Sequence, residues 1–144
     1  MAKKFIHDFI LCGLVGWCLE INFTALQSLR RRDLSLKGTT SLWMFPIYGG
    51  AVLLKPFFWL FHKCDPLFRG TVYAAMIYLA EYLSGKFLQK RECCPWDYKH
   101  CRFQFDGVIR LDFLPLWILT GLLFEKILTP SRDHTALTVK DRIT

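Results

Sequence analysis

The chain has 144 residues, of which 53% are hydrophobic and 16% aromatic, and it carries a formal net charge of +7. The apolar residues form long blocks, which is unusual for a soluble domain and leaves no room for a second domain. The Lys and Arg residues lie mainly between the blocks, where anionic headgroups are expected, and no basic face with stacking aromatic residues accompanies them. The charge therefore argues against nucleic acid as a partner.

Four apolar segments predict an all-α fold, a polytopic membrane bundle of four transmembrane helices. Each segment has about the 20 residues that a helix needs to cross a bilayer. In chain order they are Phe5–Leu29, Ser41–Phe61, Leu67–Leu88 and Val108–Leu128. We expect residues 1–129 to form one bundle and residues 130–144 a short polar tail. The pattern predicts a multi-pass protein of the cell membrane that contacts membrane lipids.

The first segment begins like a signal peptide, because Lys3 and Lys4 precede its apolar run. The run continues past Trp17 to Glu20 and Asn22, and no small-residue cleavage site follows it. We therefore expect a first helix that is retained.

The second segment contains residues that interrupt helices. Pro46, Gly49 and Gly50 lie inside it, and Pro56 follows Lys55. Such breaks survive in a membrane only where neighbours or water satisfy the freed backbone groups. The second helix is therefore expected to be irregular.

A long connection, about residues 89–107, separates the third segment from the fourth. It contains Trp96 and Tyr98, and both residue types favour the headgroup level. We expect an interfacial loop here.

The same loop carries Cys94, Asp97, His100 and Cys101, whose side chains are of metal-binding types. Their spacing matches no paired Cys-x-x-Cys arrangement, so we expect no metal and no cofactor. A disulfide among the loop cysteines is geometrically feasible, and the sequence leaves it open.

Each segment carries acidic or strongly polar residues well inside it. Counted at 1.5 Å per residue, one such residue from each helix reaches a common depth, although Asp112 could instead lie at its helix mouth. A carboxylate at membrane depth must face protein, water or a partner. Gly13 and Gly16 share a helix face with Glu20, which indicates that this face packs inward. The residues expected to line the resulting cavity, with the loop included, are Glu20, Tyr48, Glu81, Asp112, Trp96, Asp97 and Tyr98.

Two interpretations of this polar layer remain open. In the first, Glu20 and Glu81 contact the headgroup or cation of a substrate, and Tyr48 donates a hydrogen bond. In the second, the layer is a buried polar network that fixes the register of the helices. Lys55 is a candidate counter-ion, although it lies nearer the other membrane surface. Glu125 is interpreted as a snorkelling residue at a helix end.

Several blocks of residues carry a family resemblance: Gly16-Trp17-Cys18-Leu19-Glu20, Thr40-Ser41-Leu42-Trp43, Ile47-Tyr48-Gly49, Cys94-Pro95-Trp96-Asp97-Tyr98 and Pro115-Leu116-Trp117. With these blocks the chain resembles the ABC-transporter type IV permease family over nearly its full length. The resemblance implies an integral membrane protein that acts as a permease. Coupling to ATP would then require a separate ATPase subunit.

Three functions remain open at this point. The first is a transport-associated permease component that moves an unknown substrate as a homo-oligomer or in a larger complex, because one four-helix bundle offers little wall for a pathway. The second is a protein that binds or modifies lipids. The third is a non-catalytic accessory or scaffold protein. No nucleophile-elbow, P-loop or H-E-x-x-H pattern occurs, so catalysis is not indicated.

Overall fold

The computed structural model describes residues 1–129, along which helices alternate with short connections. The elements are α1 (Ala2–Arg30), α2 (Met44–Gly49), the 3₁₀ helix η1 (Gly50–Leu54), α3 (Lys55–Leu60), α4 (Pro66–Lys90), β1 (Gln104–Phe105), β2 (Ile109–Arg110), the 3₁₀ helix η2 (Leu111–Phe113) and α5 (Leu114–Leu128). The fold is mainly helical, as predicted. The exception among the described residues is the antiparallel pairing of β1 with β2.

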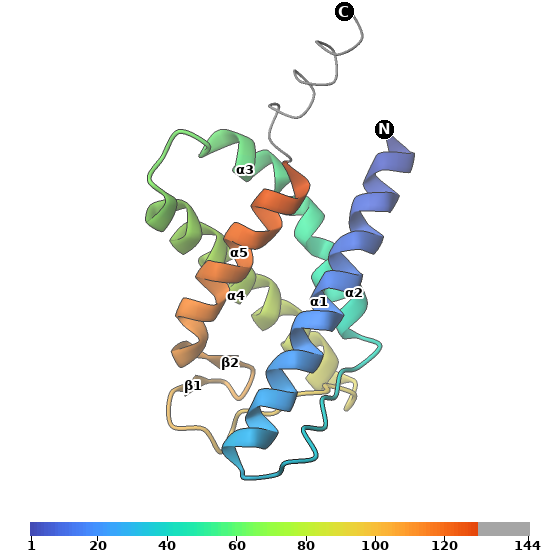
Figure 1. Ribbon diagram of the computed structural model, residues 1–144, viewed down its shortest axis with the longest axis vertical. Helices are drawn as coiled ribbons and strands as arrows, with labels where there is room; N and C mark the ends of the chain where they lie inside the picture. Colours follow the sequence, from blue (N-terminus) through green and yellow to red (C-terminus); the bar gives the residue numbers. More distant parts are fainter. Residues whose placement is uncertain (130–144) are drawn as a thin grey trace, which may run out of the picture.

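The long helices pack as two pairs. α1 lies along α2 and η1, and α4 lies along α5. In Figure 1 the start of α1, helix α3 and the end of α5 lie at the top, whereas the α1–α2 connection and the β1–β2 pair lie at the bottom. The bottom end, formed by residues 31–43 and 91–110, is called the loop end below.

The predicted second helix is present as three shorter pieces. Its helical part runs from Met44 to Leu60, with η1 inserted between α2 and α3. A proline inside a helix lacks the backbone N–H that the helix needs, but Pro56 lies in the first turn of α3, where this donor is not required. The interruption expected from the Gly and Pro residues thus takes the form of a 3₁₀ segment, and such segments often mark functional or strained positions.

The fourth helix begins later than the sequence predicted. Helix α5 starts at Leu114, with Pro115 in its first turn, instead of at Val108. The preceding residues form β2 and η2, because the pairing with β1 requires extended backbone. Asp112 therefore lies in η2 at the mouth of the helix and not within it.

A single helix within residues 1–129 is both long and apolar enough to cross a membrane by itself. This helix is α1, whose most apolar 18 residues have a mean hydropathy of 1.7. The apolar run Met44–Leu60 is shorter. Helix α5 has 15 residues, which at 1.5 Å each reach only about 22 Å. The helical fold is thus shown, whereas four spanning helices stay a prediction.

Glycines allow the helices of each pair to approach closely. Gly16 of α1 is buried, and a Cβ atom there would lie 2.0 Å from the ring of Tyr48 on α2. In the second pair, a Cβ atom at Gly121 of α5 would lie 2.6 Å from Cβ of Tyr73 on α4. The ring of Tyr73 also meets Phe58 of α3 edge to face, with a centroid distance of 4.8 Å. Aromatic side chains thus pack directly against helix backbones and join the two pairs.

We predict that Gly16→Ala destabilises the protein and that Gly50→Ala does not. The methyl group at residue 16 would overlap the ring of Tyr48, whereas nothing lies within 4 Å of a Cβ atom at residue 50. Overpacking of this kind costs about 1–3 kcal/mol. Thermal unfolding of both variants in the same detergent measures the difference, and equal midpoints would contradict the packing described here.

Candidate functional site

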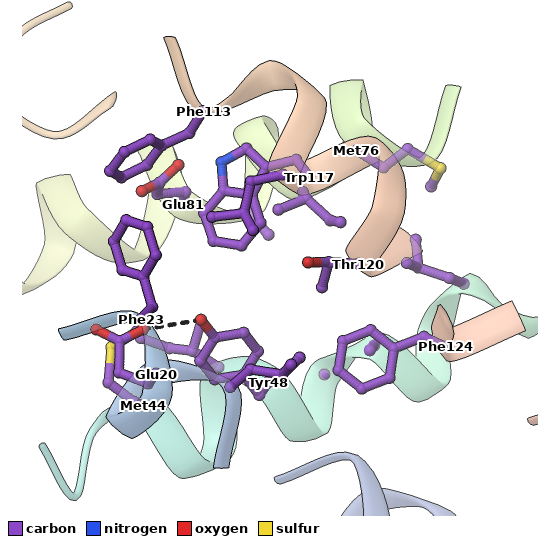
Figure 2. A pocket seen from close by; sticks show the side chains of 18 of the residues that line it. Glu20, Phe23, Met44, Tyr48, Met76, Glu81, Phe113, Trp117, Thr120 and Phe124 are labelled. Atoms are coloured by element: carbon purple, nitrogen blue, oxygen red, sulfur yellow. Dashed lines mark hydrogen bonds between the residues drawn. The ribbon is translucent and has the colours of Figure 1, made fainter. Parts of the chain in front are cut away.

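A cavity of about 250 Å³ lies between the two helix pairs. Its wall is mostly apolar, and seven aromatic side chains contribute to it: Phe23, Tyr48, Trp96, Tyr98, Phe113, Trp117 and Phe124. In Figure 2 Glu20 and Tyr48 lie along one side of this space, and Glu81 and Trp117 lie along the opposite side. Each helix pair therefore supplies one carboxyl group to the cavity.

The first carboxyl group has a protein partner. The hydroxyl of Tyr48 on α2 donates a hydrogen bond of 2.9 Å to Oε2 of Glu20 on α1 (Figure 2). Tyr48 is buried and Glu20 half-buried. Gly16 lies one helical turn before Glu20, and its lack of a side chain gives the ring of Tyr48 the room to reach the carboxyl group.

The second carboxyl group has an oxygen without a partner. Glu81 of α4 is 9% exposed, and its Oε2 atom has no hydrogen-bond partner within residues 1–129. The indole N–H of Trp117 on α5 also lacks one within this range. Both side chains line the cavity, and Figure 2 shows the indole nitrogen on the side of Glu81. The indole N–H is a donor close to the carboxyl group and can pair with it, so a ligand bound here would either join or replace that pairing.

The loop between α4 and β1 closes the cavity at the loop end. Trp96 lines the cavity, and its indole N–H donates to the carbonyl of Val108 at 3.1 Å. Tyr98 also lines it and meets Phe113 edge to face, with a centroid distance of 5.9 Å. Burial raises the pKa of the Tyr98 hydroxyl far above its usual value. The hydroxyl therefore stays protonated and can donate a hydrogen bond.

Asp97 and Asp112, which the sequence also assigned to this site, do not line the cavity. Asp97 is exposed and accepts a hydrogen bond of 3.0 Å from the backbone N–H of Lys99. Asp112 accepts two hydrogen bonds from Arg110, one of them from Nε at 3.0 Å. The hydrogen bonding by Arg110 holds the pKa of this carboxyl below its usual value. Both acids thus have local partners. Of the four residues in the predicted polar layer, Glu20, Tyr48 and Glu81 line the cavity and Asp112 does not.

Two charge networks at the opposite end of the molecule were not predicted. Asp8 of α1 accepts a hydrogen bond of 2.5 Å from Nζ of Lys55 on α3. Glu125 accepts one of 3.2 Å from the hydroxyl of Tyr73 and lies 3.6 Å from Nε of Arg69. The Glu125 side chain is only 12% exposed, so its interpretation as a snorkelling residue is wrong. Lys55 pairs with Asp8 and not with the polar layer. The sequence shows these acids within apolar segments, but it does not show which distant residues pair with them.

The cysteines of the loop are free thiols, as are the other three in the chain. Cys94 donates its S–H to the carbonyl of Trp96 at 3.2 Å. Burial raises the pKa of the Cys94 thiol above its usual value. A thiol with a raised pKa is a poor nucleophile, so this loop offers no activated cysteine at residue 94.

A family model described as "Putative ABC-transporter type IV" matches residues 7–144, and this range includes every residue of the cavity. The chain belongs to this family. The match confirms the resemblance inferred from the sequence and places the chain among transport-related membrane proteins. No solved structure matches the chain.

We predict that Tyr48→Phe destabilises the protein by about 1–3 kcal/mol, because Glu20 would lose its hydrogen-bond donor. In a double-mutant cycle with Glu20→Gln, the two losses should be less than additive, since both substitutions weaken the same bond. Tyr82→Phe is the control, because it removes an exposed hydrogen bond of 3.1 Å to Asp106. Thermal unfolding supplies the values, and fully additive losses would argue against coupling between Tyr48 and Glu20.

Proposed function

We propose that this protein is a permease-like component of a membrane transporter and that it binds its solute in the cavity between the two helix pairs. The observation that carries the proposal is the buried Oε2 atom of Glu81, which has no partner within residues 1–129. Leaving such an atom unpaired costs free energy. A bound solute that donates a hydrogen bond to Glu81 would recover it.

We propose that four segments cross the cell membrane: α1, the α2–η1–α3 run, α4 and α5. Each of them carries large apolar side chains that are exposed and do not line the cavity, among them Leu14, Trp59, Leu83 and Leu119. An apolar outer surface on every segment is favourable in lipid and unfavourable in water. The shorter segments can span by local thinning of the bilayer. Residues 1–129 would then be the membrane bundle and residues 130–144 a polar tail, which lies outside the described residues.

The cavity favours a small solute that combines an apolar body with a cationic or hydrogen-bond-donating group. Two carboxyl groups face it from opposite sides, and Glu20 is already held by Tyr48. The rings of Phe113 and Trp117 lie beside Glu81 in Figure 2 and can attract a cation through their faces. A volume of about 250 Å³ restricts the solute to a small molecule.

We also propose that the protein acts together with other protein chains in the membrane. Two helix pairs are too few to enclose a complete transport pathway across the membrane, so the protein would act as a homo-oligomer or within a larger complex. Because the 144 residues contain no P-loop pattern, ATP hydrolysis would come from a separate ATPase subunit.

The proposal predicts that Glu81→Gln weakens the binding of small organic ammonium ions. The loss should be about tenfold or more, since a hydrogen bond to a charged group contributes about 1.5–3 kcal/mol. Purified protein in detergent would be titrated with a series of alkyl and aryl ammonium ions, and those that bind would be tested for uptake into proteoliposomes. Glu92→Gln is the matched control, because it removes an exposed carboxylate outside the cavity.

Normal binding and uptake by a folded Glu81→Gln variant would refute the role of Glu81. If the wild-type protein bound none of the ions, the accessory or scaffold role would replace the permease proposal.

A further inference from the structure

A second hollow, distinct in charge from the cavity, lies at the loop end between the last turns of α1 and the start of α5. It has a volume of about 630 Å³. Its apolar part includes Phe23, Leu26 and Leu116, and its polar part includes Arg30, Arg31 and Arg110. We name this hollow the arginine groove.

The arginine groove carries an excess of positive charge. Three arginines and a single carboxylate, Asp112, line it. Arg110 is bound to Asp112 and lies over the ring of Phe113, 4.3 Å from its centroid, so its position is fixed. Arg30 and Arg31 are exposed and form no salt bridge within residues 1–129. Two guanidinium groups are therefore available to an anion.

The remaining carboxylate does not cancel this charge. The hydrogen bonding by Arg110 lowers the pKa of Asp112, and the charge of Arg30 contributes further. Asp112 thus stays ionised at neutral pH, and its single negative charge leaves the three arginines with a positive excess. The end of α1 presents backbone carbonyl groups, which repel anions. Attraction for an anion must consequently come from the arginine side chains.

Next to the charged part, the groove has an apolar part that continues onto the outer surface of the bundle. Leu26 is 60% exposed, and Leu114, at the start of α5, is exposed as well. A ligand that fits this surface carries an anionic group at one end and an apolar chain at the other. Guanidinium groups recognise phosphate oxygens through paired hydrogen bonds. Basic pockets between membrane helices bind the headgroups of anionic lipids by the same chemistry.

We infer that the arginine groove binds one anionic phospholipid, with its phosphate at Arg30 and Arg31 and an acyl chain along Leu26 and Leu116. The lipid lies outside the cavity, on the other face of a wall that the two sites share. Phe23, Phe113 and Leu116 form this wall, and the two aromatic rings meet edge to face at a centroid distance of 5.0 Å. The proposed lipid site does not depend on the proposed binding of a solute in the cavity, because neither Glu20 nor Glu81 lines the groove.

The test compares the binding of phosphatidylglycerol and phosphatidylcholine with identical acyl chains to the full chain in a neutral detergent, by native mass spectrometry. The wild-type protein should prefer phosphatidylglycerol by about tenfold or more, and the double variant Arg30→Gln/Arg31→Gln should lose this preference, since each basic residue near an anionic lipid contributes about 1 kcal/mol. The charge-matched control is Arg91→Gln/Arg102→Gln, whose residues are exposed at the same end but do not line the groove. This control should keep the preference.

Arg30→Lys/Arg31→Lys retains the charge and should keep most of the preference, which separates a lost site from a misfolded protein. Two results would overturn the inference: no preference for phosphatidylglycerol in the wild type, or an equal loss in the Arg91/Arg102 control. Competition by inorganic phosphate at the same concentration as the lipid would show that free phosphate, and not a lipid, is the ligand.

Discussion

The contact between Gly16 of α1 and the ring of Tyr48 on α2 determines how the candidate site is arranged. A side chain at residue 16 would lie 2.0 Å from that ring, so only glycine allows the two helices to approach this closely. The approach brings the Tyr48 hydroxyl to 2.9 Å from Glu20 and fixes one wall of the cavity. The opposite wall then needs only to present Glu81 and Trp117, which α4 and α5 do from their mutual interface.

The acids in the apolar segments serve two different purposes. Asp8 and Glu125 are paired with Lys55 and Arg69 at the end opposite the loops, where the pairs connect α1 to α3 and α4 to α5. Such pairs are costly to break, because each substitution would leave a buried charge alone. Glu81 has no comparable partner within residues 1–129. This difference in pairing distinguishes the acids that join helices from Glu81, on which the proposed solute site depends.

The 3₁₀ segment that interrupts the second helix forms part of the cavity wall. Gly50, Ala51 and Leu54 belong to η1, and all three line the cavity. A 3₁₀ segment is wound more tightly than an α-helix. Lys55, the first residue of α3, follows this segment directly and donates a hydrogen bond to Asp8, so the irregular segment lies between the cavity and the paired charges.

The sequence by itself determined the two longest helices and most of the polar residues that line the cavity. The predicted segments Phe5–Leu29 and Leu67–Leu88 agree with α1 and α4 within a few residues, because each apolar run ends at clear polar signals such as the N-cap Asp65. The fixed rise of an α-helix predicted one level for Glu20, Tyr48 and Glu81, and all three line the cavity. Only the tertiary structure decided which acids are paired, that Asp112 lies before the fourth helix, and that Arg30 and Arg31 line one groove with Arg110. These features depend on how the helices rotate and pack against one another, and partners 47 or 52 residues apart leave no periodic trace in a single sequence.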